Sequence, residues 1–223
     1  MRLIFVIGAS GSGKSTGLRT LNPEQTVIIN FDKKDLPWEK WKEQYSEEKK
    51  NYREVTTHGE LLDTLKYANS NPKIKVIVVD TWNREMIDYT FSKKFRATPD
   101  GRKAWANFGV DQYEFLHSIS TDYRSDLNIY LLCHKETVTD EYGILMERIA
   151  APGNMVTNLK PESFSSIVLY TTIQAIPGQR PQYFFKTVSS GVDTAKTPIG
   201  MFEEMQIPND LGFVDKRIRE YYS

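Results

Sequence analysis

The sequence predicts an α/β fold with a mainly parallel central sheet, flanking helices and C-terminal antiparallel extensions. Four apolar, β-branched runs lack polar alternation, which is typical of strands buried on both faces of a parallel sheet. These runs are residues 3–7, 26–31, 74–79 and 129–133. Helix-like segments lie between them, and this alternation of strand and helix favours a parallel sheet with helices on both faces.

The remaining segments carry their own start and stop signals. We expect helices at residues 15–21, 59–68 and 110–126. After residue 134 the pattern changes, and turns at 141–143 and 177–180 join runs that we expect to pair as two antiparallel hairpins. The expected strand pairs are 136–140 with 144–149, and 165–173 with 182–188. Residues 208–222 have apolar side chains at helical spacing behind Asn209-Asp210, which predicts a capped helix.

Composition limits the class of protein. At 223 residues the chain is long enough for one substantial core, and we treat residues 1–223 as a single domain. Lys plus Arg and Asp plus Glu each total 29, so no global charge draws the protein to nucleic acid or membrane. The one cysteine, Cys133, lies in an apolar run, which suits the reducing cytoplasm. Because no apolar run approaches the ~20 residues of a membrane helix, we expect a soluble protein without a membrane partner.

The most specific motif directly follows the first expected strand. Residues 8–15, Gly-Ala-Ser-Gly-Ser-Gly-Lys-Ser, match G-x-x-x-x-G-K-[ST] without deviation and run into an expected helix. In such a P-loop, glycines let backbone N–H groups approach a polyphosphate, and the helix N-terminus adds positive potential. We therefore expect Lys14 to reach the β- and γ-phosphates of ATP and Ser15 to ligate Mg²⁺. The expected nucleotide-binding residues are Gly8, Ala9, Ser10, Gly11, Ser12, Gly13, Lys14, Ser15 and Thr16.

A second Mg²⁺ ligand is expected at the end of a neighbouring strand. Residues 74–79 are apolar and lead directly into Asp80-Thr81, which is the form that a Walker B strand takes. Asp80 is therefore the expected acidic partner of Ser15 and would hold the metal through water. The alternative interpretation is an Asp that ends a strand and has no role in metal binding.

With both motifs placed, the chain resembles the RecA-like P-loop ATPases, and in particular the short phage nucleotide-binding proteins related to single-strand-annealing recombinases. The resemblance covers nearly the whole chain, and the P-loop is its most specific part. Its other parts are residues 76–81, 131–136, 195–202 and 207–211. The resemblance implies an ATP-binding and ATP-hydrolysing protein of DNA recombination or single-strand annealing, located in the cytoplasm of the host if it is phage-encoded.

The resemblance also implies roles for individual residues in hydrolysis. A polar residue after the fourth strand senses the γ-phosphate in that family, and this residue is His134 here. An acid at the end of the second strand activates the attacking water, for which Asp32 is the first candidate and Asp35 a weaker one. The recombinases usually carry Glu two positions after Asp32, where this chain has Lys34, and an ammonium group cannot act as that base. The departure leads us to expect slow hydrolysis.

RecA-like enzymes commonly hydrolyse ATP between subunits. The resemblance therefore implies a homo-oligomer in which a cation of the neighbouring subunit stabilises charge on the transferred phosphate. Lys196 and Arg148 are the candidates for this cation. For each of them a solvated surface cation is the alternative.

A local cluster of cations and aromatic residues occupies residues 91–105. Cations for phosphates beside aromatic rings for base stacking are what a single-stranded DNA binder needs. The cations are Lys93, Lys94, Arg96, Arg102 and Lys103, and the aromatic residues are Phe91, Phe95 and Trp105. The Pro-Asp-Gly sequence at residues 99–101 predicts a mobile loop here. The alternative is the end of an amphipathic helix with a solvated charged loop.

Two further functions fit the same motifs. A small-molecule kinase of the nucleoside-monophosphate type would use a similar P-loop, although such kinases usually close an arginine-rich lid and residues 136–150 offer only Arg148. A nucleotide-gated binding protein with little turnover would account for Lys34. These alternatives remain open beside the leading hypothesis of an ATPase with ATP, Mg²⁺ and single-stranded DNA as its ligands.

Overall fold

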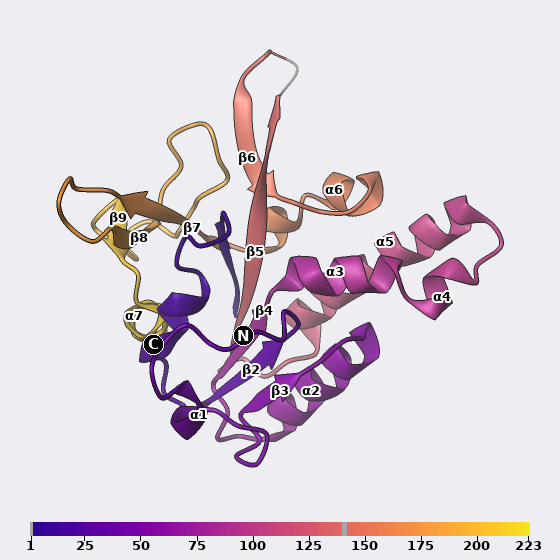
Figure 1. Cartoon of the computed structure of the whole chain (residues 1–223), viewed down its shortest axis with the longest axis horizontal. Coiled ribbons are helices and arrows are strands. Elements are labelled where there is room, and N and C mark those ends of the chain that lie inside the picture. Colours follow the sequence, from indigo (N-terminus) through magenta and orange to yellow (C-terminus); the bar gives the residue numbers. More distant parts are fainter. Residues whose placement is uncertain (1, 140–141) are drawn as a thin grey trace.

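A nine-stranded sheet runs through the described chain, which comprises residues 2–139 and 142–223 of a computed structural model (Figure 1). The strands are β1 (Arg2–Gly8), β2 (Thr26–Asn30), β3 (Tyr52–Glu54), β4 (Val76–Asp80), β5 (Asn128–Thr139), β6 (Leu145–Ile149), β7 (Ile167–Gln174), β8 (Gln182–Lys186) and β9 (Gln206–Pro208). Their order is β3-β2-β4-β5-β1-β7-β8-β9, and β6 pairs with β5 outside this path. The strands from β3 to β7 in this order pair in parallel, whereas the β5–β6, β7–β8 and β8–β9 pairs are antiparallel. The predicted fold class, with both antiparallel hairpins, is confirmed.

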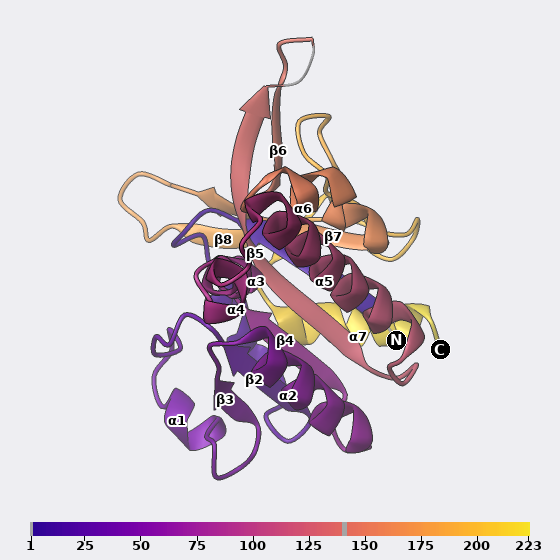
Figure 2. The ribbon, with the colours of Figure 1, turned by 90° about the vertical axis from the view of Figure 1, so that its right-hand side faces the viewer.

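Helices cover both faces of this sheet. The α-helices are α1 (Trp41–Gln44), α2 (His58–Ser70), α3 (Trp82–Thr90), α4 (Lys93–Arg96), α5 (Gly101–Thr121), α6 (Asn154–Leu159) and α7 (Leu211–Tyr221), and the 3₁₀ helices are η1 (Ser15–Thr20) and η2 (Pro161–Phe164). Figure 2 shows α2 and α5 in front of the sheet, and Figure 1 shows α7 on the opposite side from α2, α3 and α5. None of the helices in the described residues combines the length and apolar character needed to cross a bilayer.

The side chains of each central strand alternate between two hydrophobic clusters. On β1, Phe5 and Ile7 belong to the cluster that includes residues of α2, α3 and α5. The intervening Ile4 and Val6 belong to the cluster that includes residues of η1 and α7. All four side chains are fully buried. Because successive residues of a strand face opposite sides, a strand covered on both faces must be apolar at every position, which explains the uninterrupted runs in the sequence.

The longer helices begin at side chains that cap their free N–H groups. Thr57 and Glu60 form a reciprocal capping box at the start of α2. Asp100 accepts hydrogen bonds from the backbone N–H groups of Arg102 and Lys103 at the start of α5. Asp210 accepts one from Phe213 at the start of α7, which confirms the predicted capped C-terminal helix.

Two predicted helices differ from the observed ones. Residues 15–20 form the 3₁₀ helix η1 rather than an α-helix, and the chain turns away at Leu21. The helix predicted at residues 110–126 is α5, which begins at Gly101 and ends at Thr121. The predicted start was too late because Asp100 provides the cap and Ala104 already faces the core.

Strand β5 is longer than predicted. The expected strands at 129–133 and 136–140 are parts of one continuous strand, whose first part pairs with β1 and whose residues 135–139 pair with β6. Together β5 and β6 form an arm that projects from the body of the molecule (Figure 1). Part of the turn predicted at 141–143 lies outside the described residues. The arm begins at His134, where β5 leaves the buried sheet.

Candidate functional site

The P-loop connects β1 to η1 and is held in place by its own polar groups and by β7. The Ser12 hydroxyl donates a hydrogen bond to the Ala9 carbonyl at 2.7 Å, and its oxygen lies 2.6 Å from Thr171 Oγ1 on β7. A Cβ atom at Gly8 would lie 1.7 Å from the same Thr171 oxygen, so only glycine fits at the start of the loop. Gly13 has a φ of 93°, a conformation that residues with side chains rarely adopt. The loop is thus a fixed backbone cradle.

Lys14 is buried at the centre of this cradle. Its Nζ atom donates hydrogen bonds to the Gly8 carbonyl at 2.9 Å and to the Ala9 carbonyl at 2.7 Å. It also lies 3.5 Å from Nδ1 of His134. Burial lowers the pKa of the Lys14 ammonium, and the negative charge of Asp80 opposes this change. The ammonium group therefore faces the acidic side of the site.

Asp80 ends β4 with a carboxyl group that is buried and incompletely paired. Its Oδ1 atom has no hydrogen-bond partner among residues 2–139 and 142–223. Burial raises the pKa of Asp80 to about 6, and the nearby Ser15 side chain opposes the rise. A hydroxyl and a single carboxylate with a spare oxygen suit Mg²⁺, which prefers oxygen ligands and keeps several of its waters. The residues present therefore fit the expected metal.

Asp32 and Asp80 are neighbours because of the register between β2 and β4. Asn30 pairs with Asp80 across the two strands, and the N–H groups of Phe31 and Asp32 both donate to the Asp80 carbonyl, at 2.8 and 3.4 Å. The Thr81 hydroxyl lies 3.4 Å from Oδ1 of Asp32. Asp32 and Asp80 therefore both lie at the carboxyl edge of the parallel strands, where ligands of such sheets bind.

His134 faces the same site from within β5, at the point where the strand leaves the buried sheet. Its backbone N–H donates a hydrogen bond of 2.6 Å to the Asn83 side chain, which also contacts the carbonyl of Ala150. The pKa of the His134 imidazole is lowered, first by burial and then by the charge of Lys14. A neutral imidazole beside the lysine can donate or accept a hydrogen bond at the cradle.

These groups line one cleft of about 300 Å³. Of the predicted catalytic residues, Lys14, Asp32, Asp80 and His134 line it, and the weaker candidate Asp35 does so too. The remaining lining residues are Ser10, Gly11, Gly13, Ser15, Thr16, Asn30, Lys34, Leu36, Pro37, Thr81 and Tyr183. The cleft therefore combines residues from the P-loop, from the ends of β2 and β4, from the middle of β5 and from β8.

Lys196 and Arg148 lie elsewhere. Both line a separate cavity beside β6 and η2. Lys196 is exposed and forms an isolated antiparallel bridge with Val168, while Arg148 donates to Glu136 across the arm at 2.8 Å. Neither cation lines the cleft of its own chain, so either one could contact a bound phosphate only in the cleft of a neighbouring subunit.

Residues 91–105 do not form one long loop as predicted. Residues 93–96 form α4 and residues 101–105 begin α5, while residues 97–100 form only a short connection between them. Phe95 and Trp105 pack against the main core cluster. Only Phe91 among the three aromatic residues is largely exposed, at 69%. The sequence pattern failed here because Ser92 and Asp100 cap two successive helices.

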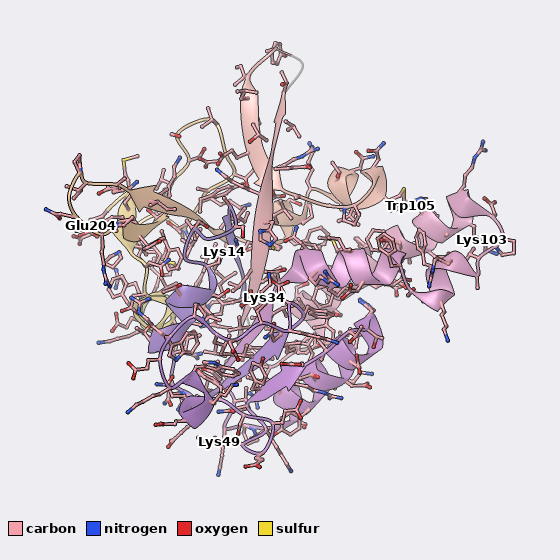
Figure 3. The ribbon with its side chains drawn as sticks, in the orientation of Figure 1. Lys14, Lys34, Lys49, Lys103, Trp105 and Glu204 are labelled. Carbon is pink, nitrogen blue, oxygen red and sulfur yellow. The ribbon has the colours of Figure 1, made fainter. Side chains whose placement is uncertain are left out.

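The five cations of this segment are nevertheless exposed: Lys93, Lys94, Arg96, Arg102 and Lys103. Lys94 pairs with Asp111 at 2.9 Å. Figure 3 shows Lys103 and Trp105 at the far end of α5 from the centre of the molecule, where Lys14 lies. A ligand bound to these cations would therefore not occupy the cleft.

Sequence reasoning missed several residues that shape the site. Thr171 and Tyr183 come from the β7–β8 hairpin and reach the P-loop through the fold alone. Asn83 accepts a hydrogen bond from the backbone N–H of His134 and so helps to position that residue. The place of Asn83 three residues after Asp80, directly behind the strand, is the one sequence signal that could have identified it. Lys34 was noted as a departure from a family pattern, and the structure places it in the lining of the cleft.

Comparison with known proteins identifies the family. Residues 2–199 match AAA_24, a family described as AAA domain. A comparison with curated proteins gave no match. Among solved structures, the chain is similar to the crystal structure of flagellar accessory protein FlaH from Methanocaldococcus jannaschii, with 14% sequence identity and a TM-score of 0.44 over 92% of this chain and 83% of that chain. Because the family match spans most of its length and includes the P-loop, the chain belongs to the AAA_24 family of P-loop NTPase domains.

Proposed function

We propose that this protein binds ATP with Mg²⁺ and hydrolyses it, and that it acts in DNA recombination or single-strand annealing. The observation that carries the first part is the meeting of Lys14, Ser15 and Asp80 in one cleft at the carboxyl edge of the sheet. Lys14 would bind phosphate oxygens, whereas Ser15 of the P-loop and Asp80 of β4 would bind Mg²⁺. Their combination supports a triphosphate rather than a lone anion.

The cradle would neutralise most of the charge of the phosphates. Backbone N–H groups of the P-loop point at phosphate oxygens in this type of loop. Lys14 would exchange its bonds to the Gly8 and Ala9 carbonyls for bonds to the β- and γ-phosphates. When Mg²⁺ is bound, the Ser15 hydroxyl and the Asp80 carboxylate would hold it, and it would supply positive charge to the phosphate oxygens.

Hydrolysis requires a group that accepts a proton from water. As the water oxygen bonds to the γ-phosphorus, the bond from this phosphorus to the bridging oxygen breaks and leaves the electron pair on ADP. Asp32 is our proposed acceptor of the proton, because it lines the cleft beside Asp80 and is only partly exposed. His134 would donate a hydrogen bond to the γ-phosphate.

Replacement of Lys14 tests nucleotide binding directly. We expect Lys14→Ala to abolish ATP binding or turnover, because the triphosphate would lose its central cation. Equilibrium binding of a fluorescent ATP analogue and phosphate release would be measured, with Lys73→Ala as an exposed lysine control and circular dichroism to verify folding. Normal ATP affinity and turnover in a folded Lys14→Ala protein would refute the assignment of the cradle.

The proposed DNA role rests on the family resemblance and on the exposed cations near α4. Its test is phosphate release with and without single-stranded DNA, combined with an assay for phosphate transfer to nucleoside monophosphates. Stimulation by DNA without transfer supports the proposal, whereas transfer would identify a kinase. The paired strands of the arm, residues 135–139 and 145–149, contain one arginine, Arg148, and that side chain is paired with Glu136, which favours the ATPase.

A further inference from the structure

Lys34 lies in the lining of the cleft, beside Asp32. It follows β2, lines the cleft together with Lys14, and approaches Oδ2 of Asp32 to 3.7 Å. The Lys34 side chain is 80% exposed, whereas that of Asp32 is 24% exposed. Figure 3 shows Lys34 and Lys14 on neighbouring segments at the centre of the molecule. The cleft thus has a second lysine, which comes from a strand end rather than from the P-loop.

The backbone directs Lys34 toward the cleft and its neighbour away from it. Lys33 has a φ of 53°, and the Asn30 side chain binds both its N–H, at 3.0 Å, and the Lys34 carbonyl, at 2.9 Å. Asn30 is itself buried and bonded to the Tyr52 hydroxyl at 2.7 Å. Lys33 consequently turns outward, where its Nζ donates to Thr56 at 2.6 Å. The buried amide of Asn30 therefore directs two adjacent lysine side chains in different directions.

The contact between Lys34 and Asp32 can be exchanged for a stronger one. An exposed ion pair at 3.7 Å contributes little to stability, because water screens both charges. A terminal phosphate carries more charge than a carboxylate and offers three acceptor oxygens, so an ammonium binds it more strongly. Lys34 already acts on the groups around this position, since its charge contributes to the lowered pKa of His134, after burial and Lys14.

We propose that Lys34 is a ligand of the terminal phosphate, supplied by the same chain, which makes the cleft prefer nucleoside triphosphates to diphosphates. On binding a triphosphate, Lys34 leaves Asp32, whose Oδ2 is then available to the attacking water. A diphosphate does not reach Lys34, so Asp32 remains paired. This inference rests on the proposed function, because it requires that the cleft binds nucleotide through the P-loop.

The test compares the affinities for two nucleotides in two matched variants. Dissociation constants of Mg²⁺ complexes of a non-hydrolysable ATP analogue and of ADP would be measured for the wild type, Lys34→Met and Lys33→Met. We expect Lys34→Met to weaken the triphosphate on the order of tenfold, the effect of one charge-assisted hydrogen bond, and to leave ADP nearly unchanged. Lys33→Met should change neither, and Lys34→Arg should retain part of the preference.

The outcomes separate this inference from the function on which it rests. If the wild type binds neither nucleotide, the proposed function fails. If the wild type binds both and Lys34→Met keeps the same ratio of affinities, only the role of Lys34 is overturned. An equal loss in Lys33→Met would also overturn it, because the effect would then be one of general charge near β2.

Discussion

At the scale of single residues, the cleft keeps a carboxyl group where water cannot stabilise its charge. The pKa of Asp80 is raised from 3.8 to about 6, mainly by burial. A raised pKa means that the folded protein binds the proton more strongly than the unfolded chain does. The stability associated with this group is therefore fully present below about pH 4 and is lost as the pH rises through about 6.

The substitution Asp80→Asn should remove the loss of stability that follows ionisation of this carboxyl group. At pH 7.5, with EDTA and without nucleotide, we expect the variant to have a higher free energy of unfolding, by up to about 3 kcal/mol. At pH 4.5 the gain should be much smaller, since the wild-type carboxyl is then largely protonated. Urea unfolding at the two pH values measures the difference, with Asp63→Asn as an exposed control. A gain that does not depend on pH would contradict the explanation.

The residues that could be predicted from the sequence are those with a fixed spacing or a clear local context. Lys14 and Ser15 follow from the spacing of the P-loop, and Asp80 follows from the apolar run before it. Thr171 could not be predicted, because it reaches Ser12 only after distant strands pair. The orientation of Lys34 depends on a buried contact of Asn30, which leaves no pattern in the sequence.

At the scale of elements, η1 and α7 are in direct backbone contact. The N–H of Gly212 donates to the Thr20 hydroxyl at 3.0 Å, and a Cβ atom at Gly212 would lie 2.4 Å from the Thr20 carbonyl oxygen. Since the obstructing atom belongs to the backbone, η1 or α7 would have to move. Ser15 is the first residue of η1, so the contact links α7 to one of the two residues that we propose hold Mg²⁺.

Gly212→Ala should therefore reduce both stability and nucleotide affinity. We expect a loss of about 1–3 kcal/mol in the free energy of unfolding, the usual cost of an overpacked contact. Gly59→Ala is the matched control, because its Cβ would meet no atom within 4 Å and alanine favours a helix. Thermal unfolding and ATP titration of both variants measure the effects. Equal behaviour of the two would show that the contact between η1 and α7 is unimportant.

Strands were more predictable than helix ends at this scale. The buried runs are apolar at every position, and this pattern is visible without knowledge of their partners. The short β3 was missed because only Tyr52 of its three residues is buried. The outer part of β5 was predicted as a strand, but its continuity with residues 129–133 was not, because the apolar run stops at residue 133 while the strand continues outside the core to pair with β6.

At the scale of the whole molecule, a chain of zero formal charge carries a group of exposed cations on α4 and at the start of α5. If single-stranded DNA is the partner, replacing Lys93, Lys94 and Arg96 by Ala should weaken its binding. The slope of log affinity against log salt should fall by about 2, because three phosphate contacts are lost at about 0.7 each.

The control variant loses the same number of positive charges, but at other positions on the surface. Lys49, Lys73 and Lys216 are exposed, and none of them lines the cavity that Lys94 lines. Their triple replacement by Ala should leave DNA affinity nearly unchanged, as measured by fluorescence anisotropy at several salt concentrations. Equal losses in both triple variants would exclude residues 93–96 as a DNA site.

The continuity of β5 has a practical consequence for following the cleft in solution. Cys133 is the one thiol of the sequence and is fully buried in β5, so a maleimide dye would react selectively with a cysteine introduced at the exposed Thr137. Thr137 lies three residues after His134 on the same continuous strand. A fluorophore at residue 137 would be attached to the same strand as His134 but outside the cleft. Its emission with and without nucleotide would measure how much of the protein has nucleotide bound.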